Sequence, residues 1–151
     1  MKDDWKQVFP LPSKGAGKLA ALNVKIIRSW SGDYPVTELK RLPDGQRQSH
    51  AGWLGDAATF ASVWSAFKPG ESAPILDFRT HLVAFVRNTE FYNRTAIAKA
   101  TLSDGVLDLL AIETRSARPI EDKVAMALIV IPRAGVSYIP SADARVAVNP
   151  E

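Results

Sequence analysis

The chain has 151 residues, of which 46% are hydrophobic and 23% charged, a composition typical of one folded domain and not of a disordered segment. It has no cysteine, which excludes disulfides, thiolate metal sites and a cysteine nucleophile, and no apolar run approaches the roughly 20 residues that cross a bilayer. The net charge of +3 comes from residues 1–50, where nine Lys or Arg face five Asp or Glu. We interpret this excess as a solvated face, because no run of consecutive basic residues indicates a nucleic-acid patch.

The first third of the chain predicts an arm, two strands and a turn. Residues 1–20 mix charged residues with prolines and glycines, which favours an extended N-terminal arm. β-branched residues and partial alternation predict a strand over residues 22–30, ended by residues 31–33. A weaker strand is predicted over residues 34–39, and the proline and glycine of residues 42–45 predict a turn after it.

One amphipathic helix is predicted over about residues 56–67. Asp56 can cap the free amides of its first turn, and large apolar residues follow at the i, i+3, i+4, i+7 spacing of one helix face. These residues are Phe60, Val63, Trp64 and Phe67. Residues 68–70, Lys-Pro-Gly, end the helix. We interpret the aromatic stripe as a core face, because aromatics at helical spacing pack against a sheet far more often than they hold a cofactor.

From residue 80 onward the sequence predicts strand after strand. The strands are expected over residues 82–87, 95–102, 106–114, 124–131 and 136–139. Ser103-Asp104-Gly105 predicts a hairpin, and the run 124–131, apolar on both faces, predicts a central strand. The small and polar residues 141–151 predict a flexible tail. The fold class is therefore α+β: a single domain over residues 21–140, with a mainly antiparallel β-sheet packed on the amphipathic helix.

Few residues suit catalysis. His50 and His81 are the only imidazoles, and their spacing fits no helical pair of metal ligands, so we predict neither a metal nor a cofactor. Asp77 and His81 are four residues apart and suit a small hydrolase that uses a serine brought in by the fold. In an extended segment, however, residues four apart lie about 13 Å from each other. The hydrolase hypothesis therefore requires a turn at Arg79-Thr80.

A loop between two predicted strands is the better candidate for a binding site. It contains Phe91, Tyr92 and Arg94, and aromatic residues and arginine are enriched at the energetic centres of protein interfaces. We predict that these three residues contact a protein partner. The alternative is that one ring packs back onto the sheet and the other has no role.

Four segments over residues 52–139 carry a family resemblance. They are FASVWSAF, APILDFRTHLVAFV, DGVLDLLAIETRSARP and VAMALIVIPRAGVSYI. The chain resembles the C-terminal domain family of the protease complex subunit PrcB, in which a Pro-x-x-Asp-Phe element leads into a strand. Pro74, Asp77 and Phe78 match that element, Gly105 begins the next strand, and residues 131–133, Ile-Pro-Arg, match the closing segment. The glycine-rich turn usual in the family is replaced here by residues 89–94, so no role of that turn is carried over.

The resemblance implies a bacterial, extracytoplasmic domain, periplasmic or at the cell surface, that is an accessory part of a protease-associated complex. It implies no catalytic residues. We therefore expect a non-enzymatic binding or accessory domain with a protein partner, and neither a transmembrane segment nor nucleic-acid binding. The alternative is the hydrolase built on His81 and Asp77. The sequence indicates neither the identity of the partner nor the oligomeric state.

Overall fold

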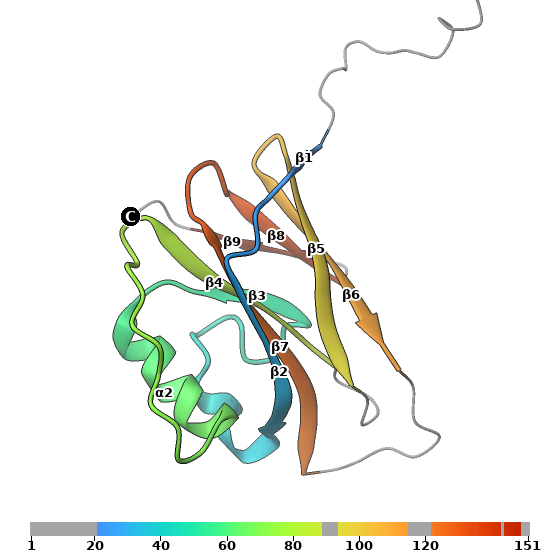
Figure 1. The fold of residues 1–151 in the computed structure, drawn as a ribbon. Helices are drawn as coiled ribbons and strands as arrows, with labels where there is room; N and C mark the ends of the chain where they lie inside the picture. The colour runs from blue at the N-terminus through green and yellow to red at the C-terminus, as the bar shows by residue number, and fades with distance from the viewer. Residues whose placement is uncertain (1–20, 89–93, 115–121, 143, 149–151) are drawn as a thin grey trace, which may run out of the picture.

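The computed structural model describes residues 21–88, 94–114, 122–142 and 144–148. Its elements, in chain order, are β1 (Leu22–Asn23), β2 (Arg28–Pro35), the 3-10 helix η1 (Val36–Arg41), β3 (Ala51–Leu54), α2 (Ala57–Phe67), β4 (His81–Arg87), β5 (Thr95–Ser103), β6 (Val106–Glu113), β7 (Lys123–Pro132), β8 (Tyr138–Ser141) and β9 (Ala144–Ala147) (Figure 1). The α+β fold class predicted from the sequence is confirmed. Within these residues no helix is long and apolar enough to span a membrane.

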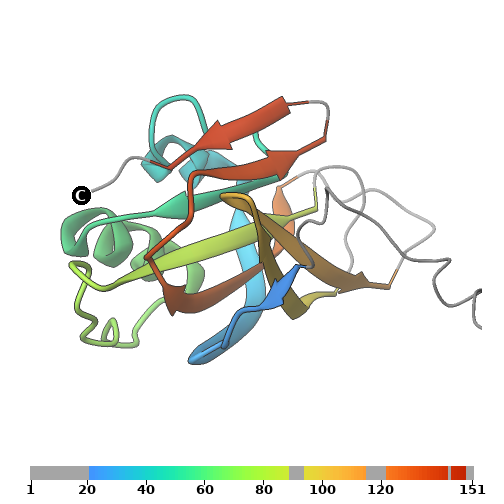
Figure 2. The same cartoon turned by 90° about the horizontal axis from the view of Figure 1, so that it is seen from above.

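The strands form two sheets that lie on each other. A four-stranded sheet has the order β2-β7-β4-β3, and a five-stranded sheet has the order β1-β5-β6-β8-β9. Neighbouring strands are antiparallel except for β6 and β8, which run parallel. Seen from above, the helix covers one face of the four-stranded sheet, and β5 and β6 lie over its other face (Figure 2). The domain therefore has three layers and two hydrophobic cores.

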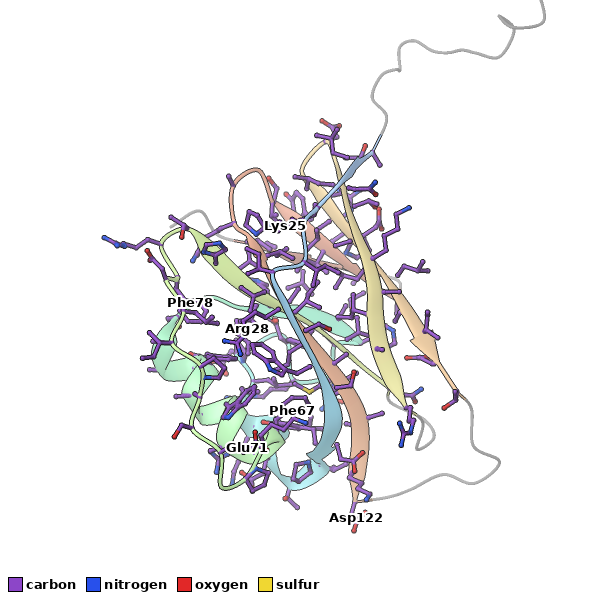
Figure 3. All side chains as sticks on the ribbon, in the orientation of Figure 1. Lys25, Arg28, Phe67, Glu71, Phe78 and Asp122 are labelled. Carbon is purple, nitrogen blue, oxygen red and sulfur yellow. The ribbon has the colours of Figure 1, made fainter. Side chains whose placement is uncertain are left out.

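Helix α2 forms as its sequence predicts. Asp56 precedes it in an extended conformation, and its Oδ1 accepts a hydrogen bond of 2.8 Å from the amide of Thr59, which satisfies one of the free amides of the first turn. The predicted stripe of apolar side chains is buried against the sheet. The ring of Phe67 lies beside β2, as Figure 3 shows. The sequence prediction of a core face is confirmed.

Strand β7 contributes to both cores, as the central position of an apolar run requires. Met126, Leu128 and Val130 face the helix, whereas Ala127 and Ile129 face the five-stranded sheet. The strand pairs with β2 on one side and with β4 on the other. The core between the two sheets was not predicted, because the sequence analysis expected a single sheet.

The beginning of the chain differs from the prediction. The strand expected over residues 22–30 is divided, because β1 pairs with β5 in one sheet while β2 pairs with β7 in the other. The break expected at residues 31–33 is wrong, since β2 continues through it to Pro35. Gly32 lets Phe67 and Lys68 pack closely on the strand. A Cβ atom at this position would lie 3.3 Å from the ring of Phe67 and from Lys68 Nζ, a tight contact.

The strand expected over residues 34–39 is also wrong beyond Pro35, because residues 36–41 form η1. This turn of helix is held by the hydroxyl of Tyr34, which donates to the carbonyl of Glu38 at 2.9 Å, and by an ion pair of 2.7 Å between Glu38 and Arg41. Since both contacts join residues three or four apart, they favour a helical turn over an extended strand.

Later elements are mostly as predicted, with two additions. The hairpin at Asp104-Gly105 is confirmed, and both residues adopt the positive φ that its turn requires. Strand β3 was not predicted. The tail expected over residues 141–151 is wrong for residues 144–147, which form β9 and pair with β8. The arm predicted over residues 1–20 lies outside the described residues.

Candidate functional site

The chain does turn at Arg79-Thr80, yet the turn does not form a catalytic pair. The amides of Thr80 and His81 both donate to the carbonyl of Asp77. The Asp77 carboxylate accepts the amide of Arg79 at 3.0 Å and its guanidinium at 3.1 Å on each oxygen, which lowers the pKa of Asp77 below its usual value. The His81 Nδ1 lies 2.8 Å from the Thr80 hydroxyl. The carboxylate therefore orients Arg79 and not the imidazole.

Hydrogen bonds from Arg133 and packing of Phe78 attach the turn at residues 77–81 to the core. Arg133 Nη1 donates to the carbonyls of Gly55 at 3.2 Å and Phe78 at 2.7 Å, and its amide donates to the carbonyl of Thr80. The ring of Phe78 packs 5.8 Å from that of Phe60 on the helix. The segment that carries the family resemblance thus fixes how the chain enters β4. Asp77 thus accepts a backbone amide where the chain turns into β4.

A large cavity of about 910 Å³ lies between β3, the start of α2, the loop 43–50 and the β8–β9 hairpin. Most of its polar side chains already bond to the protein. Gln46 Oε1 accepts the amide of Trp53 at 2.7 Å, and the Ser141 hydroxyl accepts the amide of Ala51 at 3.1 Å. The indole of Trp53 donates to the carbonyl of Ala147 at 2.9 Å. These bonds join the edge of β3 to its surroundings, so we assign this cavity to the structure and not to a ligand.

A second pocket, of about 380 Å³, lies where the middle of β2 meets the paired ends of β5 and β6. It is lined by Ser31, Gly32, Asp33, Arg94, Thr95, Ala96, Ile112 and Thr114. It differs from the large cavity because the guanidinium of Arg94 has no partner among the residues that the structure describes.

Arg94 is held in place by its backbone. Its amide donates to the Thr114 hydroxyl at 3.2 Å and its carbonyl accepts the amide of Thr114 at 3.1 Å. Its guanidinium makes no hydrogen bond or ion pair with any residue that the structure describes. Beside it, Thr95 is only 2% exposed, and its hydroxyl is buried with no hydrogen-bond partner. A buried hydroxyl without a partner costs about 1–3 kcal/mol. Thr95 shares the buried face of β5 with Ile97, so this hydroxyl lies behind the pocket wall and not in the pocket.

The pocket is positively charged in balance. Asp33 is its acidic residue, and its carboxylate lies 3.5 Å from Lys123 Nζ, so with Lys123 the charges sum to +1 and Arg94 has no ionic partner among the described residues. Ile112 adds apolar surface and is 60% exposed. A guanidinium beside an apolar wall suits a carboxylate, which accepts two parallel hydrogen bonds from arginine. Among the described residues no group of three or more His, Asp or Glu side chains is arranged to hold a metal.

Of the three predicted contact residues, the structure places Arg94 at this pocket, whereas Phe91 and Tyr92 lie outside the described residues. The sequence analysis missed Thr95 and the contribution of β2. Thr95 carries no signal of its own, because it resembles any β-branched residue at the start of a strand. The contribution of Ser31 and Asp33 was hidden by the break predicted there.

Comparison of the chain with protein-family models, with curated proteins and with solved structures gives no match. The resemblance to the C-terminal domain of PrcB stays a prediction.

Proposed function

We propose that this chain is a non-enzymatic binding or accessory domain that acts in the periplasm or at the surface of a bacterial cell and holds a protein partner at the pocket beside Arg94. The observation that carries the proposal is the guanidinium of Arg94, which has no partner among the described residues and lines a pocket beside the exposed side chain of Ile112. The resemblance to the PrcB family supports the location and the accessory role in a protease-associated complex.

A protein partner fits better than a small ligand because the exposed apolar surface continues beyond the pocket. Leu110 and Ile112 lie two residues apart on β6, on the same face of the strand, and are 57% and 60% exposed. Arginine surrounded by apolar surface is typical of the residues that dominate binding energy in protein interfaces. The pocket then accepts one polar group of the partner, while the face of β6 covers part of the remaining contact.

The test is site-specific photocrosslinking in the source bacterium. A photoreactive amino acid replaces Ile112, and a matched variant carries it at Ile75, which is 99% exposed in the segment between α2 and β4. We expect one discrete crosslinked protein from position 112, none from position 75, and loss of the crosslink when Arg94→Gln is added. Crosslinks of equal yield from both positions, or no crosslink at position 112, contradict the proposal.

A further inference from the structure

The two edge strands of the four-stranded sheet, β3 and β2, differ in whether their outward backbone groups are hydrogen-bonded. The outward amides of β3, those of Ala51 and Trp53, are taken by side chains from outside the sheet. At the other edge, no strand among the described residues lies beyond β2. Unpaired backbone at a sheet edge is a template for a further strand. One edge is therefore closed and the other is open.

The hydrogen-bond pattern identifies which groups of β2 are open. Val36 donates to the carbonyl of Asp122, so the even-numbered residues of β2 pair with β7, and residues 29, 31 and 33 direct their amides and carbonyls outward. The carbonyl of Ser31 confirms this direction, because it accepts a hydrogen bond of 3.0 Å from Lys68 Nζ at the end of α2. Ser29 and Ser31 are exposed.

The open edge leads directly into the pocket, because Ser31 and Asp33 form its β2 wall while Arg94 stands on the other wall. Figure 3 shows Lys25 before β2 and Arg28 at its first residue, so basic residues lie at the beginning of the edge. Within the described residues, neither Arg28 nor Arg94 forms an ion pair. The edge thus joins unpaired backbone groups to an uncompensated positive charge.

We propose that an extended segment of the protein partner adds to β2 as a further strand and places a carboxylate side chain on Arg94. This inference rests on the proposed function and specifies its mode. Main-chain hydrogen bonds to β2 supply affinity, and the pocket selects an acidic side chain. Lys68 leaves the carbonyl of Ser31 when the segment binds, and until then it shields the edge, a common use of lysine on exposed strands.

The experiment uses peptides as probes. A phage-displayed library of random peptides of about eight residues, within the usual length of a strand, is selected on the folded full chain. Enriched peptides are synthesised with a fluorophore and their affinities are measured by anisotropy. We expect enriched sequences to carry Asp or Glu at one position, and replacement by Asn or Gln to weaken binding by about tenfold or more, as for a charge-assisted hydrogen bond.

Two controls identify the mode. N-methylation of the peptide backbone, one residue at a time, removes single amide donors, and we expect losses at every second position only, because alternate amides of a strand face β2. In the protein, Arg94→Gln should abolish the preference for an acidic peptide, whereas Arg79→Gln, which changes an arginine that is already bound to Asp77, should preserve it. Three outcomes overturn the inference. They are failure to enrich any peptide, loss of peptide affinity on N-methylation at consecutive positions, and a preference for acidic peptides that Arg94→Gln leaves unchanged.

Two other occupants of the edge are separated by the same measurements. Dimerisation of the chain in sedimentation, abolished by the enriched peptide, would assign the edge to a second copy. A rise in peptide affinity after removal of residues 1–20 would assign it to the chain's own N-terminal segment. Either result would contradict the proposal that a segment of another protein occupies the edge of β2. A crosslinked partner at position 112 without any enriched peptide leaves the proposed function standing and removes only the strand-addition mode.

Discussion

Replacing Gly52 by alanine is expected to destabilise the domain strongly. Gly52 lies in β3 opposite Phe85, and an added Cβ atom would lie 2.6 Å from the Phe85 ring and would also collide with Gln46 Oε1. That oxygen is fixed, because it accepts the amide of Trp53 and because Gln46 is only 6% exposed. The methyl group therefore forces either the ring or the amide side chain to move.

The expected magnitude follows from these two displacements. Overpacking of a filled core costs about 1–3 kcal/mol, because the neighbouring side chains must leave their preferred rotamers. If Gln46 moves, the amide of Trp53 loses its acceptor, which costs about 1–3 kcal/mol more. We expect Gly52→Ala to lower the free energy of unfolding by about 2–5 kcal/mol, a large part of the 5–15 kcal/mol typical of a domain.

Urea unfolding followed by circular dichroism measures this change. Gly32→Ala is the matched control, because its Cβ atom would meet the Phe67 ring only at 3.3 Å, and a loss below about 1 kcal/mol is expected. The double variant Gly52→Ala with Gln46→Ala should lose at least about 1 kcal/mol less than the sum of the single losses, because the truncated side chain leaves room for the methyl group. A Gly52→Ala variant as stable as the native chain, or strictly additive losses, would refute the steric argument.

Three further predictions concern single side chains. Burial raises the pKa of Tyr34 to about 12 from 10.0. The contribution of its protonated hydroxyl to the free energy of unfolding is therefore complete below pH 10 and is lost as the pH rises toward 12. Urea unfolding should show a loss of about 2–3 kcal/mol over that range, and this loss should be absent in Tyr34→Phe. Asp56→Ala should cost about 1 kcal/mol in the same assay, because Thr59 loses its cap, and Asp56→Asn should retain most of it. Arg87 is 3% exposed, its Nε has no partner among the described residues, and burial lowers its pKa. Arg87→Met should therefore leave the free energy of unfolding unchanged or raise it by up to about 2 kcal/mol. A loss above about 1 kcal/mol would contradict this prediction.

Elements with local signals were predictable from the sequence. The spacing of apolar residues and the cap at Asp56 were sufficient for α2, because the information lies within one or two turns of the chain. The Asp104-Gly105 pair was sufficient for the β5–β6 hairpin, since few residues other than glycine and aspartate accept the positive φ of its turn.

Elements that depend on distant partners were not predictable. Strand β3 has four residues including Gly52, and it exists because β4 pairs with it and because Gln46 and Ser141 take its outward amides. Strand β9 has only four residues, and its pairing with β8 decides its conformation. Neither segment has the length or the alternation that identifies a strand by itself.

The candidate site was predictable only in part, for the same reason. Arg94 stood out because an arginine beside aromatic residues between two strands is typical of a contact surface. The pocket itself requires β2 to continue through Gly32 and to meet the ends of β5 and β6, which no local pattern indicates. Thr95 became notable only when its burial and its missing partner were known.

The β8–β9 hairpin pairs with the five-stranded sheet and also forms hydrogen bonds with β3 of the four-stranded sheet. Strand β8 is joined to β6 through the single residue pair Val106 and Tyr138, whereas Ala147 receives the indole of Trp53 from β3. Because only one residue pair joins its backbone to β6, the hairpin is held chiefly by side-chain contacts such as the buried Ile139, and we expect amide exchange there to be faster than in β7. Because Trp53 contacts the hairpin directly, the fluorescence of that indole would report its detachment while the helix-side core stays folded.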